Sequence, residues 1–223
     1  MKILILAAMD KELMLLENLI ENLEEIKLPS SVIKKGEINI HEIYLAKCGI
    51  GKVNAALNCQ ILIDTIQPDL MINSGVAGGA GLPVGTLLMA DRVCYDDVWC
   101  GPGTNYGQAD GFPLFMLPCQ SILKKAKNLF ADLTTGLICT GDKFITTAEE
   151  IKFIKSKFPD VMAVDMESAA LAQTCIKNSV EFLIIRVVSD TPGQGDNISQ
   201  YLDFWQVAPK KNFEIIKDLI FVL

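Results

Sequence analysis

The sequence predicts a single-domain α/β protein of three layers, with helices on both sides of a central mixed, largely parallel and twisted sheet. Short unbroken apolar runs, typical of strands buried on both faces, alternate along the chain with stretches of helical spacing. Half of the 223 residues are hydrophobic, which is enough for a large core. No linker, repeat or low-complexity stretch divides residues 1–223, so we expect one domain.

The order of the elements follows from the spacing of the apolar residues and from the breakers between them. Strands are expected at residues 3–8, 32–35, 38–47, 70–73, 87–94, 136–140, 161–166 and 182–189. Helices are expected at residues 11–25, 52–66, 121–130, 147–157, 167–177 and 209–222.

Local signals add detail to this outline. Residues 36–37 are expected to turn the chain between two neighbouring strands, and residues 147–150 have the S/T-x-x-E spacing of a capping box at a helix start. Residues 96–113 form a long loop with several glycines, and such loops in compact domains are usually functional or disordered. The stretch 190–199 is expected to be flexible.

Composition excludes several classes of protein. The net charge is −7, and only two of the 20 basic residues are arginines, so the basic footprint of a nucleic-acid binder is absent. No apolar run approaches the ~18–20 residues that span a membrane. The seven cysteines are scattered and form no C-x-x-C pair, which favours free thiols in the cytoplasm and neither a metal nor a cofactor. We expect a small molecule or another protein as the partner.

The glycine motifs fit no common nucleotide-binding pattern. The residues around Gly49 and Gly51 lack the first glycine and the Ser/Thr of a P-loop, and residues 101–107 miss the G-x-G-x-x-G spacing by one residue. The glycines of residues 75–79 follow a buried strand. They indicate either a tight turn or a backbone that lies close to a ligand.

Carboxylates follow several of the predicted strands, where ligands bind in open α/β sheets. Glu12 comes after the first strand, Glu167 after the strand at 161–166, and Asp190 after the strand at 182–189. Each could instead be structural, for example by favouring a helix N-terminus. Arg186 lies inside an apolar strand, where an unpaired guanidinium is too costly to bury, so it needs a carboxylate or a ligand as partner.

Six motifs in order resemble the purine nucleoside phosphorylase superfamily, and most closely its 5′-methylthioadenosine/S-adenosylhomocysteine nucleosidase branch. The resemblance runs nearly end to end. Its carriers are the sequences AMDKE at residues 8–12, CGIGKV at 48–53, NSGVAGG at 73–79, GDKFI at 141–145, VDMESAA at 164–170 and RVVSD at 186–190.

The resemblance implies a nucleoside phosphorylase-like fold and hydrolysis of the bond between adenine and ribose, with a purine nucleoside as substrate. It implies that Asp190 protonates the purine at N7, that Glu12 activates water on the opposite face of the ribose, and that Arg186 orients Glu12 or the water. The residues that it implies for substrate binding are Met9, Ile50, Val76, Phe144, Ile145, Met166, Glu167, Ser189 and Tyr201. It also implies a homodimer whose partner loop closes the site.

Two other functions stay open on the sequence alone, a phosphate-dependent nucleoside phosphorylase and a non-catalytic nucleoside-binding protein. Phosphorylases of this superfamily hold phosphate with several arginines, whereas this chain offers Arg186 alone at a matched position. The sequence departs from the family at Val76, where a serine is common, and at Trp99 and Pro102 in the long loop. These departures leave the 5′-substituent of the substrate open.

Overall fold

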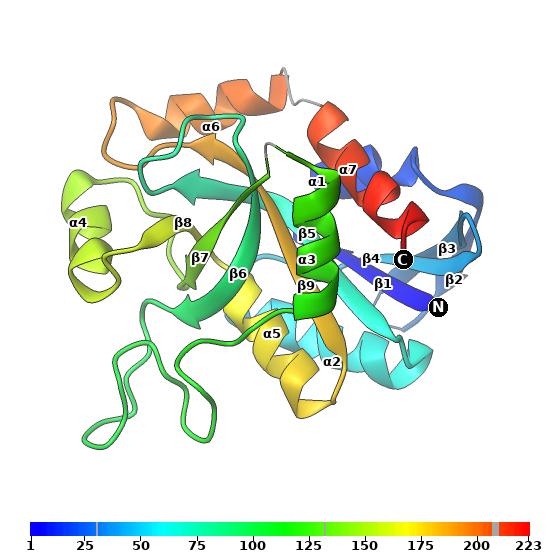
Figure 1. Ribbon diagram of the computed structural model, residues 1–223, viewed down its shortest axis with the longest axis horizontal. Coiled ribbons are helices and arrows are strands. Elements are labelled where there is room, and N and C mark those ends of the chain that lie inside the picture. The colour runs from blue at the N-terminus through cyan, green and yellow to red at the C-terminus, as the bar shows by residue number, and fades with distance from the viewer. Residues whose placement is uncertain (30, 132, 207–209) are drawn as a thin grey trace.

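The computed structural model describes residues 1–29, 31–131, 133–206 and 210–223, with residues 210–213 described by their backbone alone (Figure 1). The strands are β1 (Lys2–Ala7), β2 (Glu21–Lys27), β3 (Val32–Ile38), β4 (His41–Lys47), β5 (Leu70–Gly79), β6 (Leu87–Tyr95), β7 (Thr134–Thr140), β8 (Val161–Asp165) and β9 (Glu181–Asp190). The helices are α1 (Asp10–Glu17), α2 (Lys52–Ile66), α3 (Gln120–Leu129), α4 (Ala148–Lys157), α5 (Ser168–Lys177), α6 (Asn197–Gln206) and α7 (Lys210–Phe221).

All of these strands belong to one mixed sheet with the order β2-β3-β4-β1-β5-β8-β7-β6-β9. The pairs β1–β4, β1–β5, β5–β9, β6–β7 and β7–β8 are parallel, and the pairs β2–β3, β3–β4, β5–β8 and β6–β9 are antiparallel. Because β9 also pairs with β5, the strands β5, β8, β7, β6 and β9 close into a ring. The β2–β3–β4 meander extends the sheet away from this ring.

Helices cover both faces of the sheet, as the sequence predicts. Helices α2 and α5 pack against each other and against one face, and Figure 1 shows them side by side at the bottom of the view. Helices α1, α3, α6 and α7 supply the apolar side chains of a second core cluster on the other face. The α/β class and the layered arrangement are therefore confirmed.

The expected helix over residues 11–25 is wrong in its second half. Helix α1 ends at Glu17, and residues 21–27 form the edge strand β2, whose residues are all exposed. The reason is tertiary: Ile20 turns into the core, and β2 pairs with β3 beside Gly36. A Cβ on Gly36 would lie 2.5 Å from both the Ile20 side chain and the Glu21 carbonyl oxygen, so this glycine permits a close approach.

The expected turn at residues 36–37 is consequently also wrong, because Gly36 lies inside β3. The chain turns instead at Asn39 and Ile40, where Asn39 adopts the left-handed conformation with a φ of 55°. Asparagine tolerates this conformation better than most residues, since its short polar side chain bonds locally.

Two further segments differ from the expectation and both bear on the site. Strand β5 continues past residue 73 to Gly79 because it pairs in parallel with β9 along this stretch. Residues 197–206 form α6, although the first three were assigned to a flexible stretch and the other seven to no element. By contrast, α2 has the predicted bounds, and Thr147 and Glu150 form the predicted capping box at the start of α4.

None of the helices in the described ranges is both long and apolar enough to cross a membrane. The long loop over residues 96–113 contains neither helix nor strand, as expected, and Figure 1 shows that the chain after β6 makes extended excursions from the body of the protein.

Candidate active site

A cavity lies where the C-terminal ends of β1, β5, β8 and β9 meet. Its volume is about 620 Å³, including the part that opens to solvent, and small-molecule sites span roughly 300–1,000 Å³. Eleven of the twelve residues that the sequence singled out line it: Met9, Glu12, Ile50, Val76, Phe144, Ile145, Met166, Glu167, Ser189, Asp190 and Tyr201. The twelfth, Arg186, lies behind the cavity wall and is 1% exposed.

Glu12 is held in the cavity wall by backbone N–H groups. One of its carboxylate oxygens accepts hydrogen bonds from the amides of Ala8 (2.9 Å) and Met9 (3.0 Å), and the other accepts from the amide of Val76 (3.0 Å). The first two bonds arise locally, because Glu12 occupies the third position of α1 and reaches back to its N-terminus. The third joins α1 to β5.

Gly75 makes room for this carboxylate. A Cβ on Gly75 would lie 2.6 Å from Oε1 of Glu12, closer than real contacts of this kind. Residues 75–79 belong to strand β5, so the predicted tight turn is wrong. The group that the Gly75 backbone approaches in the structure is the Glu12 carboxylate, and a close approach to a ligand stays a prediction.

Burial and hydrogen bonding act on Glu12 in opposite directions. Loss of solvent raises the pKa of Glu12 above its ordinary value, since only 2% of the residue is exposed. The charge of Arg186 and the three backbone N–H groups lower the pKa and offset part of this effect. The Glu12 carboxylate is thus a stronger base than a solvated glutamate, and its ionised form is stabilised by the three backbone N–H groups.

Asp190 ends β9 on the other side of the cavity and is held by side chains. Its Oδ1 accepts from the Ser189 hydroxyl at 2.7 Å, and its Oδ2 accepts from the Asn197 amide at 2.8 Å. A bulge in the β5–β9 pairing makes Asp190, rather than Ser189, the residue opposite Gly78. Burial raises the pKa of Asp190, and the bonds from Asn197 and Ser189 offset this only in part.

Glu167 lies between β8 and α5. Its Oε1 accepts from the backbone N–H of Gly51 at 2.9 Å, just before the start of α2. Burial and then the neighbouring charge of Asp165 raise the pKa of Glu167, Arg186 and the Gly51 amide lower it, and the net result is a pKa of about 7. Three carboxyl groups with raised pKa values therefore face one cavity, a pattern that is common at functional sites.

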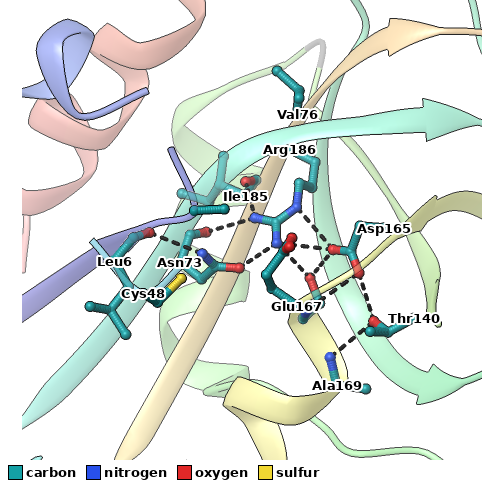
Figure 2. A network of polar contacts seen from close by, with 12 residues as sticks. Leu6, Cys48, Asn73, Val76, Thr140, Asp165, Glu167, Ala169, Ile185 and Arg186 are labelled. Carbon is teal, nitrogen blue, oxygen red and sulfur yellow. Dashed lines mark hydrogen bonds and ion pairs between the residues drawn. The ribbon is translucent and has the colours of Figure 1, made fainter. Parts of the chain in front are cut away.

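Arg186 has the carboxylate partner that the sequence requires, and this partner is Asp165. The guanidinium donates from Nε to Oδ2 of Asp165 (3.0 Å), and its NH2 nitrogen forms an ion pair with the same oxygen at 2.9 Å (Figure 2). It also donates to the side chain and carbonyl oxygen of Asn73, to the Ser168 hydroxyl (2.9 Å) and to the Ile185 carbonyl (3.1 Å). Within the described residues, none of its N–H groups donates to Glu12, so it acts on Glu12 through its charge.

An aromatic cluster forms the end of the cavity nearest α6. The Phe144 and Tyr201 rings meet edge to face with centroids 5.4 Å apart, and Tyr201 contacts Trp205 in the same way at 6.0 Å. The Tyr201 hydroxyl lies 3.5 Å from the Met9 sulfur. Phe144 is 41% exposed and Ile50 is 50% exposed, so this end of the cavity opens to the surface.

Sequence reasoning missed two residues that hold the site together. Asp165 is the last residue of β8 and was given no role from the sequence, whereas it binds the one arginine of the site. Asn197 lay in the stretch expected to be flexible, yet it bonds both Asp190 and the Ile145 carbonyl (3.1 Å). The preceding Asp196, an N-cap residue type, was a signal that a helix begins here, and its carboxylate accepts from the Ser199 amide.

The charges around the cavity disfavour a large anion. Lys143 is the single cationic side chain among the lining residues, and it pairs with Glu150. Arg92 lies elsewhere and pairs with Asp91 and Asp160. Over the described residues, no group of three or more His, Cys, Asp or Glu side chains is arranged to hold a metal ion.

Comparison with known proteins places this cavity in a family. A family model described as the phosphorylase superfamily matches residues 2–220. The 5′-methylthioadenosine/S-adenosylhomocysteine nucleosidase of Geobacillus thermodenitrificans is 36% identical over 231 residues, which cover 100% of this chain and 98% of the relative. The chain belongs to the 5′-methylthioadenosine/S-adenosylhomocysteine nucleosidase family of the phosphorylase superfamily.

Solved structures of this nucleosidase family match the whole chain. The enzyme of Streptococcus pneumoniae with the transition-state inhibitor MT-ImmA superposes with a TM-score of 0.92 at 35% identity, covering 99% of this chain and 98% of that one. The enzyme of Neisseria meningitidis with methylthio-immucillin-A gives a TM-score of 0.92 at 32% identity, covering 100% and 99%. The resemblance noted in the sequence is thereby confirmed.

Proposed function

We propose that this protein hydrolyses the N-ribosidic bond of 5′-substituted adenosines and releases adenine and the 5′-substituted ribose. Candidate substrates are 5′-methylthioadenosine, S-adenosylhomocysteine and 5′-deoxyadenosine. The observation that carries the proposal is the pair of buried carboxyl groups, Glu12 and Asp190, that line one cavity with different hydrogen-bond partners. Membership of the nucleosidase family supports the same reaction.

The departing adenine needs a proton, and Asp190 is placed to supply it. As the bond to ribose breaks, negative charge builds up on the purine, and protonation at N7 relieves it. Asp190 is buried and its pKa is raised, so its carboxyl group holds a proton at a higher pH than a solvated aspartate does. Ser189 and Asn197 fix the orientation of this group through hydrogen bonds to its two oxygens.

The attacking water needs a base on the opposite side of the sugar, and Glu12 fits this role. Its carboxylate is fixed by three backbone amides, and burial makes it more basic. One acid that protonates the leaving group and one base that activates water is the division of labour in inverting glycosidases. Arg186, 1% exposed and bonded to Asp165, contributes positive charge behind Glu12.

The remaining lining residues account for the three parts of the substrate. Glu167 has one oxygen bonded to Gly51, which leaves the other for the ribose hydroxyls, and Met166 packs beside the sugar. Phe144 stacks on the adenine, and the Ile145 backbone reads its edge. Met9, Ile50 and Tyr201 enclose the 5′-substituent, and Val76 adds an apolar surface to the wall beside Glu12.

Charge favours water over phosphate as the nucleophile. A phosphate dianion would meet Glu12, Glu167 and Asp190, with only Lys143 as a cationic lining residue. Buried charge of one sign without compensation is costly, so we expect the phosphorylase reaction to be absent.

The test measures adenine release chromatographically across adenosines that carry methylthio, homocysteinyl, hydrogen or hydroxyl at the 5′ position, with and without inorganic phosphate. Hydrolysis that yields free 5′-substituted ribose and is unaffected by phosphate supports the proposal. A ribose 1-phosphate product would establish a phosphorylase. Binding of all these nucleosides without adenine release would instead establish a binding protein on the same fold.

We further propose that the protein is a homodimer that associates through α2 and α5. Helix α2 exposes an apolar stripe of Val53, Leu57 and Ile61, four residues apart and 66%, 60% and 39% exposed. A groove between α2, α5 and the long loop borders this stripe. In sedimentation velocity, Leu57→Glu should yield a monomer, whereas Ile40→Glu, at the more exposed β3–β4 turn, should sediment as the unchanged protein does. Equal sedimentation of both variants would refute this interface.

We place the protein in the cytoplasm. All seven cysteines are free, and five of them are buried, as expected for a protein that folds in a reducing compartment. Fractionation of the source cells, followed by the adenine-release assay, tests this location.

A further inference from the structure

We propose that Asp165 is a positioning residue of the nucleosidase reaction, and that its carboxylate keeps the Arg186 guanidinium from pairing with Glu12 or Glu167. This inference rests on the function proposed above and adds a residue to it. Asp165 borders the cavity, but its side-chain oxygens bond to protein groups, so it does not need to touch the substrate for this role.

The contacts of Asp165 are all with hydrogen-bond donors. Oδ1 accepts from the Thr140 hydroxyl (2.6 Å) and the Ser168 amide (3.3 Å). Oδ2 accepts from Nε of Arg186 and from the Ser168 hydroxyl, and it forms an ion pair with the NH2 nitrogen of Arg186 (Figure 2). A carboxylate accepts on every side, so it satisfies all of these donors together. An amide could not, because its NH2 group would face other donors.

The charges around Arg186 explain why this arrangement matters. Glu12, Asp165 and Glu167 are 2%, 8% and 7% exposed, and Arg186 is the one fully buried cation within the described residues. A buried guanidinium needs a carboxylate partner, because an unpaired buried charge is costly. Asp165 is that partner through its Oδ2 oxygen, and this leaves Glu12 to the backbone amides and one oxygen of Glu167 to the cavity.

The neighbours of Glu167 allow the sign of the effect to be worked out. The groups that act on its pKa are Asp165 and Glu12, which raise it, and Arg186 and the Gly51 amide, which lower it. The Cys48 thiol and the Tyr201 hydroxyl also face these acids. Removing the charge of Asp165 takes away a negative neighbour and leaves the positive charge of Arg186 without its partner. Both changes favour ionised Glu167 and ionised Glu12.

The experiment measures kcat and kcat/KM against pH for 5′-methylthioadenosine hydrolysis by the full chain and by Asp165→Asn. Activity falls on the acidic side as the groups that must be ionised become protonated. In Asp165→Asn we expect this acidic limb to move down by about one pH unit. We expect kcat above the limb to fall about tenfold, because a less basic Glu12 is a weaker general base.

Two matched variants separate the effect of the Asp165 charge from the effect of the hydrogen bonds that Asp165 accepts. Thr140→Val and Ser168→Ala each remove a neutral donor to Asp165 and keep both charges, and Ser168→Ala also removes an acceptor of Arg186. We expect each to keep kcat/KM within about threefold of the wild type and to leave the limb in place. Asp165→Glu, which keeps the charge, should restore the position of the limb.

Three outcomes would overturn the proposal. The first is an Asp165→Asn enzyme that is folded and has an unmoved acidic limb. The second is a tenfold or larger loss of kcat/KM in Ser168→Ala, which would show that the hydrogen bonds of Asp165, and not its charge, matter for activity. If Asp165→Asn does not fold, the Ser168→Ala result is the test. The third is wild-type activity in Asp165→Asn. If the wild type itself releases no adenine, the proposed function fails, whereas an active wild type with an unmoved limb removes this inference alone.

Discussion

The two carboxyl groups of the cavity are held in different ways. Glu12 is fixed by the backbone amides of Ala8, Met9 and Val76, whereas Asp190 is fixed by the side chains of Ser189 and Asn197. Both groups are buried and both have raised pKa values. Only Glu12 has a charged group, Arg186, among the causes that lower its pKa.

This difference suits one group to act as a base and the other as an acid. A backbone N–H can only donate, so three of them around Glu12 favour the ionised carboxylate. The hydroxyl of Ser189 can rotate to accept as well as donate, so it also tolerates a protonated Asp190. Activity should therefore fall at low pH as Glu12 takes up a proton and at high pH as Asp190 loses its proton. Environments that separate the pKa values of two acids in this way are typical of paired carboxylates in catalysis.

The largest expected effect comes from removing the acid. Asp190→Asn keeps the size of the side chain but cannot transfer a proton, so kcat should fall by about three to four orders of magnitude. Single-turnover adenine release measures the loss. Asp196→Asn, on an exposed residue at the start of α6, is the matched control and should stay within about threefold. A fall of less than tenfold in Asp190→Asn would show that another group protonates the purine.

Removing the base should cost slightly less. In Glu12→Gln the amide NH2 must face at least one of the backbone N–H groups, and the side chain no longer accepts a proton from water. We expect kcat to fall by about two to three orders of magnitude while substrate binding, followed by calorimetry, changes little. Asp10→Asn, in the same turn of α1 but paired on the surface with Lys47, is the control and should keep its activity. Retention of turnover by Glu12→Gln would contradict its role as the base.

The space beside Glu12 provides a sharper test of the backbone cradle. Gly75→Ala puts a methyl group 2.6 Å from Oε1 of Glu12, so the carboxylate must shift away from its backbone amides. We expect kcat to fall about 10- to 100-fold, since moving a catalytic group by about 1 Å can slow a reaction about 100-fold. Adding Glu12→Asp to Gly75→Ala should cost little more, because the shorter acid relieves the clash. Additive losses in the double variant would mean that the two residues do not interact.

The same contrast separates what the sequence could predict from what it could not. The surroundings of Glu12 could be predicted because two of its hydrogen bonds are local: Ala8, Met9 and Glu12 lie in one motif at a strand-to-helix junction. The surroundings of Asp190 could be predicted only in part. Its motif residue Ser189 was identified, but Asn197 was not, because no apolar periodicity marks the first turn of α6.

Contacts between segments that are distant in the sequence account for the other differences. Arg186 was known to need a carboxylate, but only the folded sheet decides that β8 brings Asp165 to it rather than α1 bringing Glu12. Likewise, residues 21–27 have helical spacing and yet pair with β3, because tertiary pairing overrides local preference. The alternation of strands and helices required no such information, and it was predicted almost completely.

The smallest expected effect tests the side chains around Asp190. Asn197 donates to Oδ2 of Asp190 and lowers its pKa, so Asn197→Ala should raise that pKa. Because Asp190 acts while protonated, the loss of activity at high pH should move to higher pH, by up to about one unit. We expect kcat to fall about tenfold or less, since Ser189 still holds the other oxygen. Ser199→Ala, which removes a bond to Asp196 in the same turn of α6, should leave the alkaline limb unchanged. A limb that moves equally in both variants would trace the effect to the start of the helix. A limb that moves in Asn197→Ala alone, while the acidic limb set by Glu12 stays in place, would show that the two carboxyl groups are tuned independently.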